Sequence, residues 1–449
     1  MGSPLDADAG SGGGHQRHER RRVGHPQPSV AVTGRLSALG RPQHARHWRA
    51  ILLLGVWGPG LVVMLADTDA GSLVTAAQSG AQWGYALLLP QILLVPVLYM
   101  VQEVVVRLGV VTGQGHGQLI REHFGRGWGA VSATALLASA LGALLTELAG
   151  IAGVGALFGV SRWASVPVAT TMLVGVAFVG SFRRVERIAL AFGLAELAFI
   201  PLVVLAHPDA GQVVAGLRSL PLGHRSYLYL LAANVGAVVM PWMIFYQQSA
   251  IVAKGLTPDD IPSERRDTAV GAVVTQIVMA AVVVAFATTG SHAPLSSVSD
   301  LAHALGPRVG GHVAAALLGA TVLGAALVAA LVVSLAGSWG VAEVLGWRHS
   351  LDERPGRRNA RFFGLYALAH VAGAVVVLSS ADLVGLAVDV EVLNALILPV
   401  VLALLLALES RALPPEHRMR GPYRVLCTAT CVAVMVFGLL MFPVVLHAR

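Results

Sequence analysis

The sequence predicts an all-α polytopic membrane protein with about eleven transmembrane helices. Hydrophobic residues make up 55% of its 449 residues, whereas charged residues make up only 12%. Apolar runs of about 20 residues, the length of a helix that crosses about 30 Å of hydrocarbon, recur along the chain. A soluble domain of this size would not leave so many uninterrupted apolar segments. No segment between these runs is long enough to form a second globular domain.

The first 48 residues differ from the rest, since they are rich in Gly, His, Pro and Arg and contain no apolar run. We therefore expect residues 1–48 to form a disordered, basic cytoplasmic tail, and neither a signal peptide nor a folded unit. A transmembrane domain is predicted over residues 49–446. Its eleven spans are expected at about 49–80, 86–109, 128–158, 163–181, 186–206, 228–252, 268–289, 311–345, 362–380, 384–409 and 423–446.

Positive charge is distributed unevenly across these spans. If the N-terminus is cytoplasmic, 26 of the 31 Lys and Arg residues fall in cytoplasmic segments and five fall on the other side. Cytoplasmic loops of membrane proteins carry such an excess. We therefore predict a multi-pass protein of the cytoplasmic membrane with a cytoplasmic N-terminus and, because the number of spans is odd, an extracytoplasmic C-terminus. The net charge of +7 is thus explained by basic residues in cytoplasmic segments next to the membrane. The lipid bilayer, and not nucleic acid, is therefore the expected partner.

The first span carries two carboxylates, Asp67 and Asp69, in an otherwise apolar run that continues with Gly71. An acidic residue at bilayer depth is costly and normally faces a cavity, a partner or an ion pathway. We predict that Gly71 weakens the helix and that the Ala66 carbonyl and the carboxylates turn toward one point, forming half of a cation site. On an unbroken helix Asp67 would not face the same way as Asp69, so Asp67 joins the site only through the break.

The sixth span is also interrupted, because Pro241 stands in its middle, directly after Met240. Proline removes one backbone hydrogen bond and clashes with the preceding turn, which frees carbonyl groups near Ala237 and Val238. Two discontinuous helices in corresponding halves of a chain point to the substrate site of an inverted-repeat transporter. We therefore expect repeats of five spans over about 49–206 and 228–409, with the substrate site between the two breaks and 423–446 as an extra helix.

Five short motifs resemble those of one protein family. They are GPG at Gly58–Gly60, AQSGAQWGY at Ala77–Tyr85, RLGVVTG at Arg107–Gly113, Asp69–Ser72 at the place of an Asp-Pro-Gly-Asn motif, and Met240–Met243 at the place of Met-Pro-His-Asn. On these residues the chain resembles the Nramp (natural resistance-associated macrophage protein) family of divalent metal transporters, over about residues 50–410. The resemblance implies a LeuT-type fold of five plus five helices, in which helices 1 and 6 are broken.

Carried over residue by residue, the resemblance implies a metal site. Its ligands would be the side chains of Asp69 and Met240 and the carbonyls of Ala66 and Ala237. Counting back from Pro399 places Glu391 where the family has Gln, and Ser72 stands in place of an Asn ligand. Asp67 is a further candidate for this metal site.

The resemblance is weaker along the family's proton route. Trp242 replaces a His linked to proton movement, and Glu147 matches the first acid of an Asp-x-x-Glu pattern in the third span. Glu147 and Trp242 are therefore the candidates for a gating or proton role. A different coupling is also open: if Asp69 and Glu391 lie together without metal, one of these like charges holds a proton, which an arriving metal ion would expel.

The expected function is secondary-active inward transport of a divalent transition metal, without any cofactor. The thioether of Met240 favours Mn or Fe, whereas Glu391 favours a harder cation. One alternative is a proton-uncoupled transporter of a cation such as Mg. A second is a LeuT-type carrier of an organic solute such as an amino acid, although an acidic site repels a carboxylate. A metal sensor without transport also stays open, as does the oligomeric state.

An enzyme is not expected. The sequence contains no H-E-x-x-H motif, no convincing G-x-S-x-G elbow and no P-loop.

Overall fold

The structure is a computed structural model that describes residues 58–178, 181–291, 295–353, 355–380 and 382–446. The chain divides into Met1–Gly55 and Val56–Arg449, and all described residues belong to the second unit. The predicted tail over 1–48 and the start of the first predicted span therefore lie outside the described residues.

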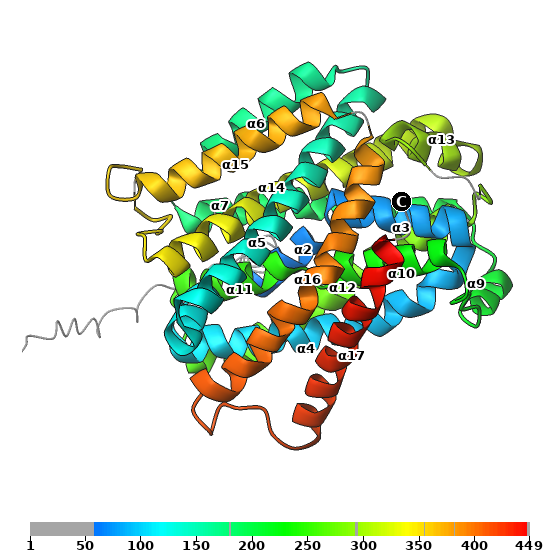
Figure 1. Cartoon of the computed structure of the whole chain (residues 1–449). Coiled ribbons are helices and arrows are strands. Elements are labelled where there is room, and N and C mark those ends of the chain that lie inside the picture. The colour runs from blue at the N-terminus through cyan, green and yellow to red at the C-terminus, as the bar shows by residue number, and fades with distance from the viewer. Residues whose placement is uncertain (1–57, 179–180, 292–294, 354, 381, 447–449) are drawn as a thin grey trace, which may run out of the picture. The chain divides into compact units, whose positions relative to one another are not determined.

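Every regular element among the described residues is a helix (Figure 1). In chain order they are α2 (Pro59–Asp67), α3 (Ala70–Trp83), η1 (Gly84–Leu87), α4 (Leu88–Thr112), α5 (His116–Leu157), α6 (Arg162–Ala177), α7 (Phe182–Gly193), η2 (Leu194–Ala198), α8 (Phe199–Leu205), α9 (Ala210–Gly216), α10 (Arg225–Val238), α11 (Pro241–Lys254), η3 (Pro258–Asp260), α12 (Ile261–Ala287), α13 (Val298–Val309), α14 (Gly311–Leu345), α15 (Ala360–Ser379), α16 (Leu383–Ala412) and α17 (Gly421–Leu446).

These helices confirm the predicted all-α polytopic fold. Nine helical stretches in the described ranges are long and apolar enough to cross a membrane, one of them joining α3 to α4. The eleven predicted spans correspond to α2 with α3, α4, α5, α6, α7 through α8, α10 with α11, α12, α14, α15, α16 and α17. Helix α6 falls outside the nine stretches because it has only 16 residues.

The helix boundaries follow from local chemistry. The first N–H groups of a helix lack partners within it, and side-chain oxygens accept from them at Ser161 before α6 and at Asp382 before α16. Helix α5 begins twelve residues before the span predicted at 128–158. Its backbone is non-helical at Gly125, where φ is 86° and ψ is 177°, so a kink separates a short first segment from the long helix that matches the predicted span.

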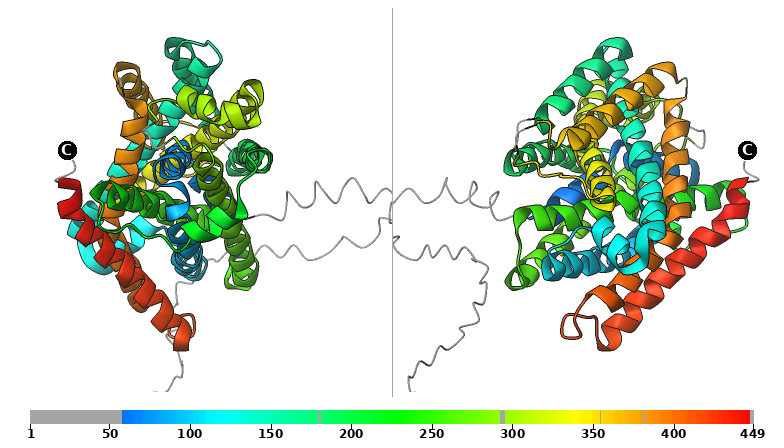
Figure 2. Two further views of the ribbon diagram at one scale, coloured as in Figure 1. Left: turned by 90° about the vertical axis from the view of Figure 1, so that its right-hand side faces the viewer. Right: turned by 60° about the vertical axis from the view of Figure 1, so that its left-hand side comes forward.

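Helices α5 and α14 pack along one another, and α10 packs on α16. Helix α14 is rich in Ala, Gly and Ser and is almost entirely buried from Thr321 onward, as expected where small residues let helix backbones approach in a membrane. Helix α17, drawn in red, lies along one edge of the described helices (Figure 2) and leaves most of its residues exposed. The two broken helices are therefore enclosed by α5, α12, α14 and α16.

Candidate functional site

The first span is interrupted at Thr68 and Asp69. Helix α2 ends at Asp67, Thr68 has φ −79° and ψ 48°, and Asp69 has the extended ψ of 172° before α3 begins. The Ser72 N–H donates to Asp69 Oδ1 over 2.7 Å, so Asp69 is the N-cap of α3. The break thus lies at Thr68–Asp69, before Gly71, which sits in the first turn of α3. The prediction that Gly71 weakens the helix at the break was wrong in position, because the capping of α3 by Asp69 sets the break.

The second interruption lies where Pro241 predicted it. Helix α10 ends at Val238, Met240 is the extended N-cap residue of α11, and Pro241 occupies the first turn of α11. Proline fits this position because its missing N–H would have no helical partner there. The Ser72 hydroxyl donates to the Ala237 carbonyl over 3.1 Å, which ties the first turn of α3 to the end of α10. The two breaks therefore meet.

Glu391, from α16, lies against both broken helices. Its Oε2 accepts from Asn394 Nδ2 over 3.0 Å, whereas its Oε1 has no hydrogen-bond partner. A Cβ added at Gly71 would stand 2.6 Å from Oε1, and one at Gly236 would stand 1.8 Å from the Glu391 carbonyl oxygen. Only glycine permits the approach of Gly236 to the Glu391 backbone, and Gly71 leaves room for the Glu391 carboxyl group beside α3.

Glu147, from α5, contacts α3 directly. The Ala70 N–H donates to Glu147 Oε2 over 3.1 Å, and the Thr146 hydroxyl donates to Oε1 over 2.9 Å. A carboxylate at a helix N-terminus satisfies unpaired N–H groups and opposes the positive end of the helix dipole. Glu147 is therefore a cap of α3, an arrangement that sequence spacing does not reveal.

Met240 and Trp242 contact each other at the start of α11. Trp242 Nε1 donates to Met240 Sδ over 3.0 Å, and both side chains are fully buried. The indole thus holds the thioether in one orientation and occupies one of its lone pairs.

Asp67 and Glu196 complete the set of buried acids near the breaks. Asp67 is fully buried, lies within electrostatic range of Asp69 and Glu391, and has no hydrogen-bond partner on either carboxyl oxygen. Glu196, from η2, lies beside Thr68. Glu196 was not singled out from the sequence, although a Glu inside the apolar fifth predicted span is a signal for function.

Negative charge dominates this region. Asp67, Asp69, Glu147, Glu196 and Glu391 are all buried, and no Lys or Arg is buried among the described residues. Buried charge is costly without compensation. In the described part of the chain, no three His, Cys, Asp or Glu side chains are arranged around one metal position. A cation here would therefore also need sulfur, hydroxyl or carbonyl ligands, which the two breaks supply.

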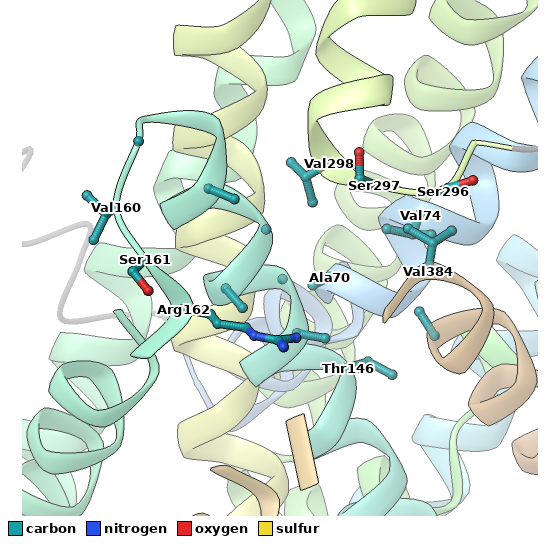
Figure 3. A pocket seen from close by; sticks show the side chains of 17 residues that line it. Ala70, Val74, Thr146, Val160, Ser161, Arg162, Ser296, Ser297, Val298 and Val384 are labelled. Carbon is teal, nitrogen blue, oxygen red and sulfur yellow. The ribbon is translucent and has the colours of Figure 1, made fainter. Parts of the chain in front are cut away.

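A cavity of about 520 Å³ reaches this region from one end of the helices (Figure 3). Its lining includes Ala70, next to Asp69, and Thr146, next to Glu147, and continues to Ser161 and Arg162 in the α5–α6 connection. The cavity therefore connects the break in the first span with the end of α5.

Polar contacts join neighbouring helices at the other end of α5. Ser249 Oγ, from α11, donates to Glu343 Oε1 of α14 over 2.5 Å, and the Gly117 N–H of α5 donates to Glu343 Oε2 over 3.0 Å. His116 Nδ1 lies 2.8 Å from Gln248 Oε1. These contacts join α5, α11 and α14, and a second cavity of about 430 Å³ lies beside them, lined by residues that include Ser249 and Glu343.

Comparison with known proteins gives one family. A profile of the family described as natural resistance-associated macrophage protein-like matches residues 60–443. The divalent metal cation transporter MntH 1 of Pseudomonas aeruginosa is 32% identical over 288 residues, which are 60% of this chain and 64% of that protein. The chain covers between 46% and 64% of the length of several such curated relatives.

Two solved structures share the fold. The crystal structure of the Eremococcus coleocola manganese transporter with an aromatic bis-isothiourea compound has a TM-score of 0.71 at 19% identity, covering 90% of this chain and 89% of that one. MhsT in complex with L-phenylalanine has a TM-score of 0.60 at 13% identity, covering 86% and 98%. At these identities the likeness shows the fold alone, and that fold is the LeuT-type arrangement predicted from the sequence.

Proposed function

Because the chain belongs to the natural resistance-associated macrophage protein-like family, we propose that it carries a divalent metal cation, Mn²⁺ or a similar transition metal, across the cytoplasmic membrane. The observation that carries the proposal is the meeting of two helix breaks at unpartnered carboxyl oxygens, Asp69 Oδ2 and Glu391 Oε1. Such oxygens, buried without any nearby cationic side chain, are suited to a cation. The names of the manganese transporter and the MntH relative support the same substrate class.

The proposed ligands come from both breaks. Asp69 Oδ2, Glu391 Oε1 and Met240 Sδ supply two oxygens and one sulfur, and the carbonyls of Ala66 and Ala237 lie at the ends of α2 and α10. Thioether sulfur beside oxygen favours Mn²⁺ or Fe²⁺ over Mg²⁺ and Ca²⁺, which prefer oxygen alone. Ser72 acts through the Ala237 carbonyl, to which its hydroxyl donates.

The distribution of Lys and Arg favours a cytoplasmic N-terminus. With that orientation, the cavity beside Ala70 and Thr146 opens to the outside, and the contacts of Glu343 with Ser249 and Gly117 close the cytoplasmic side. The conformation is then outward-facing. Inward transport requires these cytoplasmic contacts to part while the cavity beside α5 closes.

For proton coupling we propose the Asp69–Glu391 route expected from the sequence, in place of one through Glu147. Since Glu147 caps α3, we assign the exchangeable proton to the pair Asp69 and Glu391, which are like charges in a buried site. A divalent cation that binds both carboxylates displaces that proton.

A second candidate is a proton-uncoupled carrier of a harder cation such as Mg²⁺. One specific observation favours it: the Met240 sulfur already accepts from Trp242, while Glu391 presents a free carboxylate oxygen. An organic-solute carrier is disfavoured because the buried acids would repel a substrate carboxylate.

Competition for uptake separates these candidates. The purified protein is reconstituted into proteoliposomes that contain a metal-sensitive dye. Mn²⁺ uptake is then measured in the presence of excess Mg²⁺, Ca²⁺ or an amino-acid mixture, and the internal pH is recorded. We expect uptake of Mn²⁺ that Mg²⁺ inhibits weakly, together with proton movement. Equal transport of Mg²⁺ without proton movement would establish the second candidate, and binding without flux would make the protein a sensor.

A further inference from the structure

Asp67, Thr68 and Glu196 share a property that the proposed metal site does not use. All five of their side-chain oxygens, Oδ1 and Oδ2 of Asp67, Oγ1 of Thr68 and Oε1 and Oε2 of Glu196, are buried without a hydrogen-bond partner. The three residues are at most 1% exposed. Each unpartnered buried polar group costs about 1–3 kcal/mol, and charged groups cost more, so such a concentration is rare without a ligand.

The fold places these oxygens together. Gly193 at the end of α7 lies against the Leu65 side chain of α2, where a Cβ on Gly193 would stand 2.9 Å from Leu65 Cβ. Three residues later, the carboxyl group of Glu196 lies beside the Thr68 hydroxyl and within electrostatic range of Asp67. The Thr68 contact lacks hydrogen-bond geometry, so neither group satisfies the other.

The backbone is irregular on both sides of this group. Thr68 ends α2 with a non-helical ψ of 48°, and Glu196 lies in the short 3₁₀ segment η2, which interrupts the fifth span between α7 and α8. Such segments inside a span often mark functional positions. Thr68 is also the C-cap residue of α2, so it stands at the negative end of that helix dipole.

The chemistry of this group selects its ligand. The side chains present only oxygen, and none of the charged groups that act on Glu196 or Asp67 is a cation. Oxygen ligands suit a hard cation. Mg²⁺ gives up its waters reluctantly, which disfavours it among these fully buried side chains, whereas Na⁺ is a hard cation that carries half the charge and is dehydrated at lower cost.

We propose that Asp67, Thr68 and Glu196 form a second cation site, separate from Asp69 and Glu391, and that this site binds Na⁺. A divalent ion bound at Asp69 and Glu391 would leave Asp67 and Glu196 uncompensated, and Na⁺ offsets part of that charge. Bound Na⁺ would also hold the end of α2 against η2. The site does not depend on which metal the Asp69 site carries.

Thermal unfolding of the purified full-length protein in detergent tests the proposal, with choline replacing Na⁺ at constant ionic strength. A ligand that binds only the folded protein raises its Tm as its concentration rises. We expect Na⁺, but not K⁺ or choline, to raise the Tm of the wild type. For Glu196→Gln the Na⁺ dissociation constant should rise at least about tenfold, as is usual when a group that supports a metal site is lost.

Two further variants keep the test decisive. Thr68→Val keeps the side-chain volume and removes one oxygen, so its Na⁺ affinity should fall severalfold even if Glu196→Gln does not fold. Glu343→Gln, a buried Glu whose two oxygens have partners, should keep the wild-type response to Na⁺. A Tm of the wild type that does not distinguish Na⁺ from choline, or an unchanged Na⁺ affinity in both Glu196→Gln and Thr68→Val, would overturn the proposal. Mn²⁺ uptake measured in parallel reports on the metal site alone.

Discussion

Glu147 on α5 accepts a 3.1 Å hydrogen bond from the backbone N–H of Ala70, the first residue of α3. This bond fixes the half-helix whose preceding residue, Asp69, carries the central carboxylate. Glu147, a candidate for a gating or proton role in the sequence analysis, therefore also stabilises the structure, because its charge faces the positive end of helix α3. Substitution can separate these two roles.

Glu147→Gln keeps an oxygen that can accept from Ala70, so we expect Mn²⁺ uptake to fall less than about tenfold and the Tm to change little. Glu147→Ala removes the cap and should destabilise the protein by about 1–2 kcal/mol. Uptake and thermal unfolding of both variants are compared with the wild type. Complete loss of transport in a stably folded Glu147→Gln would instead assign Glu147 an essential proton role.

Gly236→Ala should disrupt the contact between α10 and α16. The added Cβ would stand 1.8 Å from the Glu391 carbonyl oxygen, a backbone atom that cannot move away easily. We expect destabilisation of about 3 kcal/mol, seen as a lower Tm or a loss of folded protein. Gly364→Ala in α15 is the matched control, because a Cβ there meets no atom within 4 Å. A Tm of Gly236→Ala equal to that of the wild type would show that α10 and α16 are not in close contact at this position.

Met240→Ala should change the metal selectivity of transport more than its rate. Removing the thioether leaves oxygen ligands, so the uptake ratio of Mn²⁺ to Mg²⁺ should fall about tenfold. Met243, a buried residue of α11 three positions later, provides the control, and Met243→Ala should keep the wild-type ratio. Competition uptake with both ions measures this ratio. If the ratio is the same in the two variants, Met240 is not a ligand.

Thiol labelling tests the orientation and the cavity together. Ala156 lines the cavity at one end of α5, whereas Ala253 and Trp339 line the second cavity at the other end. We expect a membrane-impermeant thiol reagent applied outside cells to label Ala156→Cys and block uptake, and to leave Ala253→Cys unlabelled until the membrane is opened. The native Cys427 and Cys431 are buried in α17 and should not react. Labelling with the opposite sidedness would reverse the predicted topology.

Apolar runs were sufficient to predict where the membrane-spanning helices lie, although not the shorter helices α9 and α13. The span predicted at 311–345 coincides with α14, and Pro241 correctly located the second break. Periodicity does not report which neighbour a side chain faces, because that depends on helices distant in sequence. The cap from Glu147 to Ala70 and the approach of Glu196 to Thr68 are contacts of this kind. The expectation that Gly71 causes the break in the first span failed for a related reason. Its small size leaves room for the contact with Glu391, which the sequence does not reveal.

The central claim is that the Asp69 carboxylate binds the transported cation. Its most direct test is Mn²⁺ uptake into proteoliposomes by Asp69→Asn, which keeps the shape of the side chain and removes its charge. The control is Asp209→Asn, which alters an exposed acid that caps α9. We predict that Asp69→Asn folds with a Tm near that of the wild type. Its rate of Mn²⁺ uptake should fall about ten- to one-hundredfold, while Asp209→Asn transports normally. Wild-type uptake by Asp69→Asn would contradict the claim.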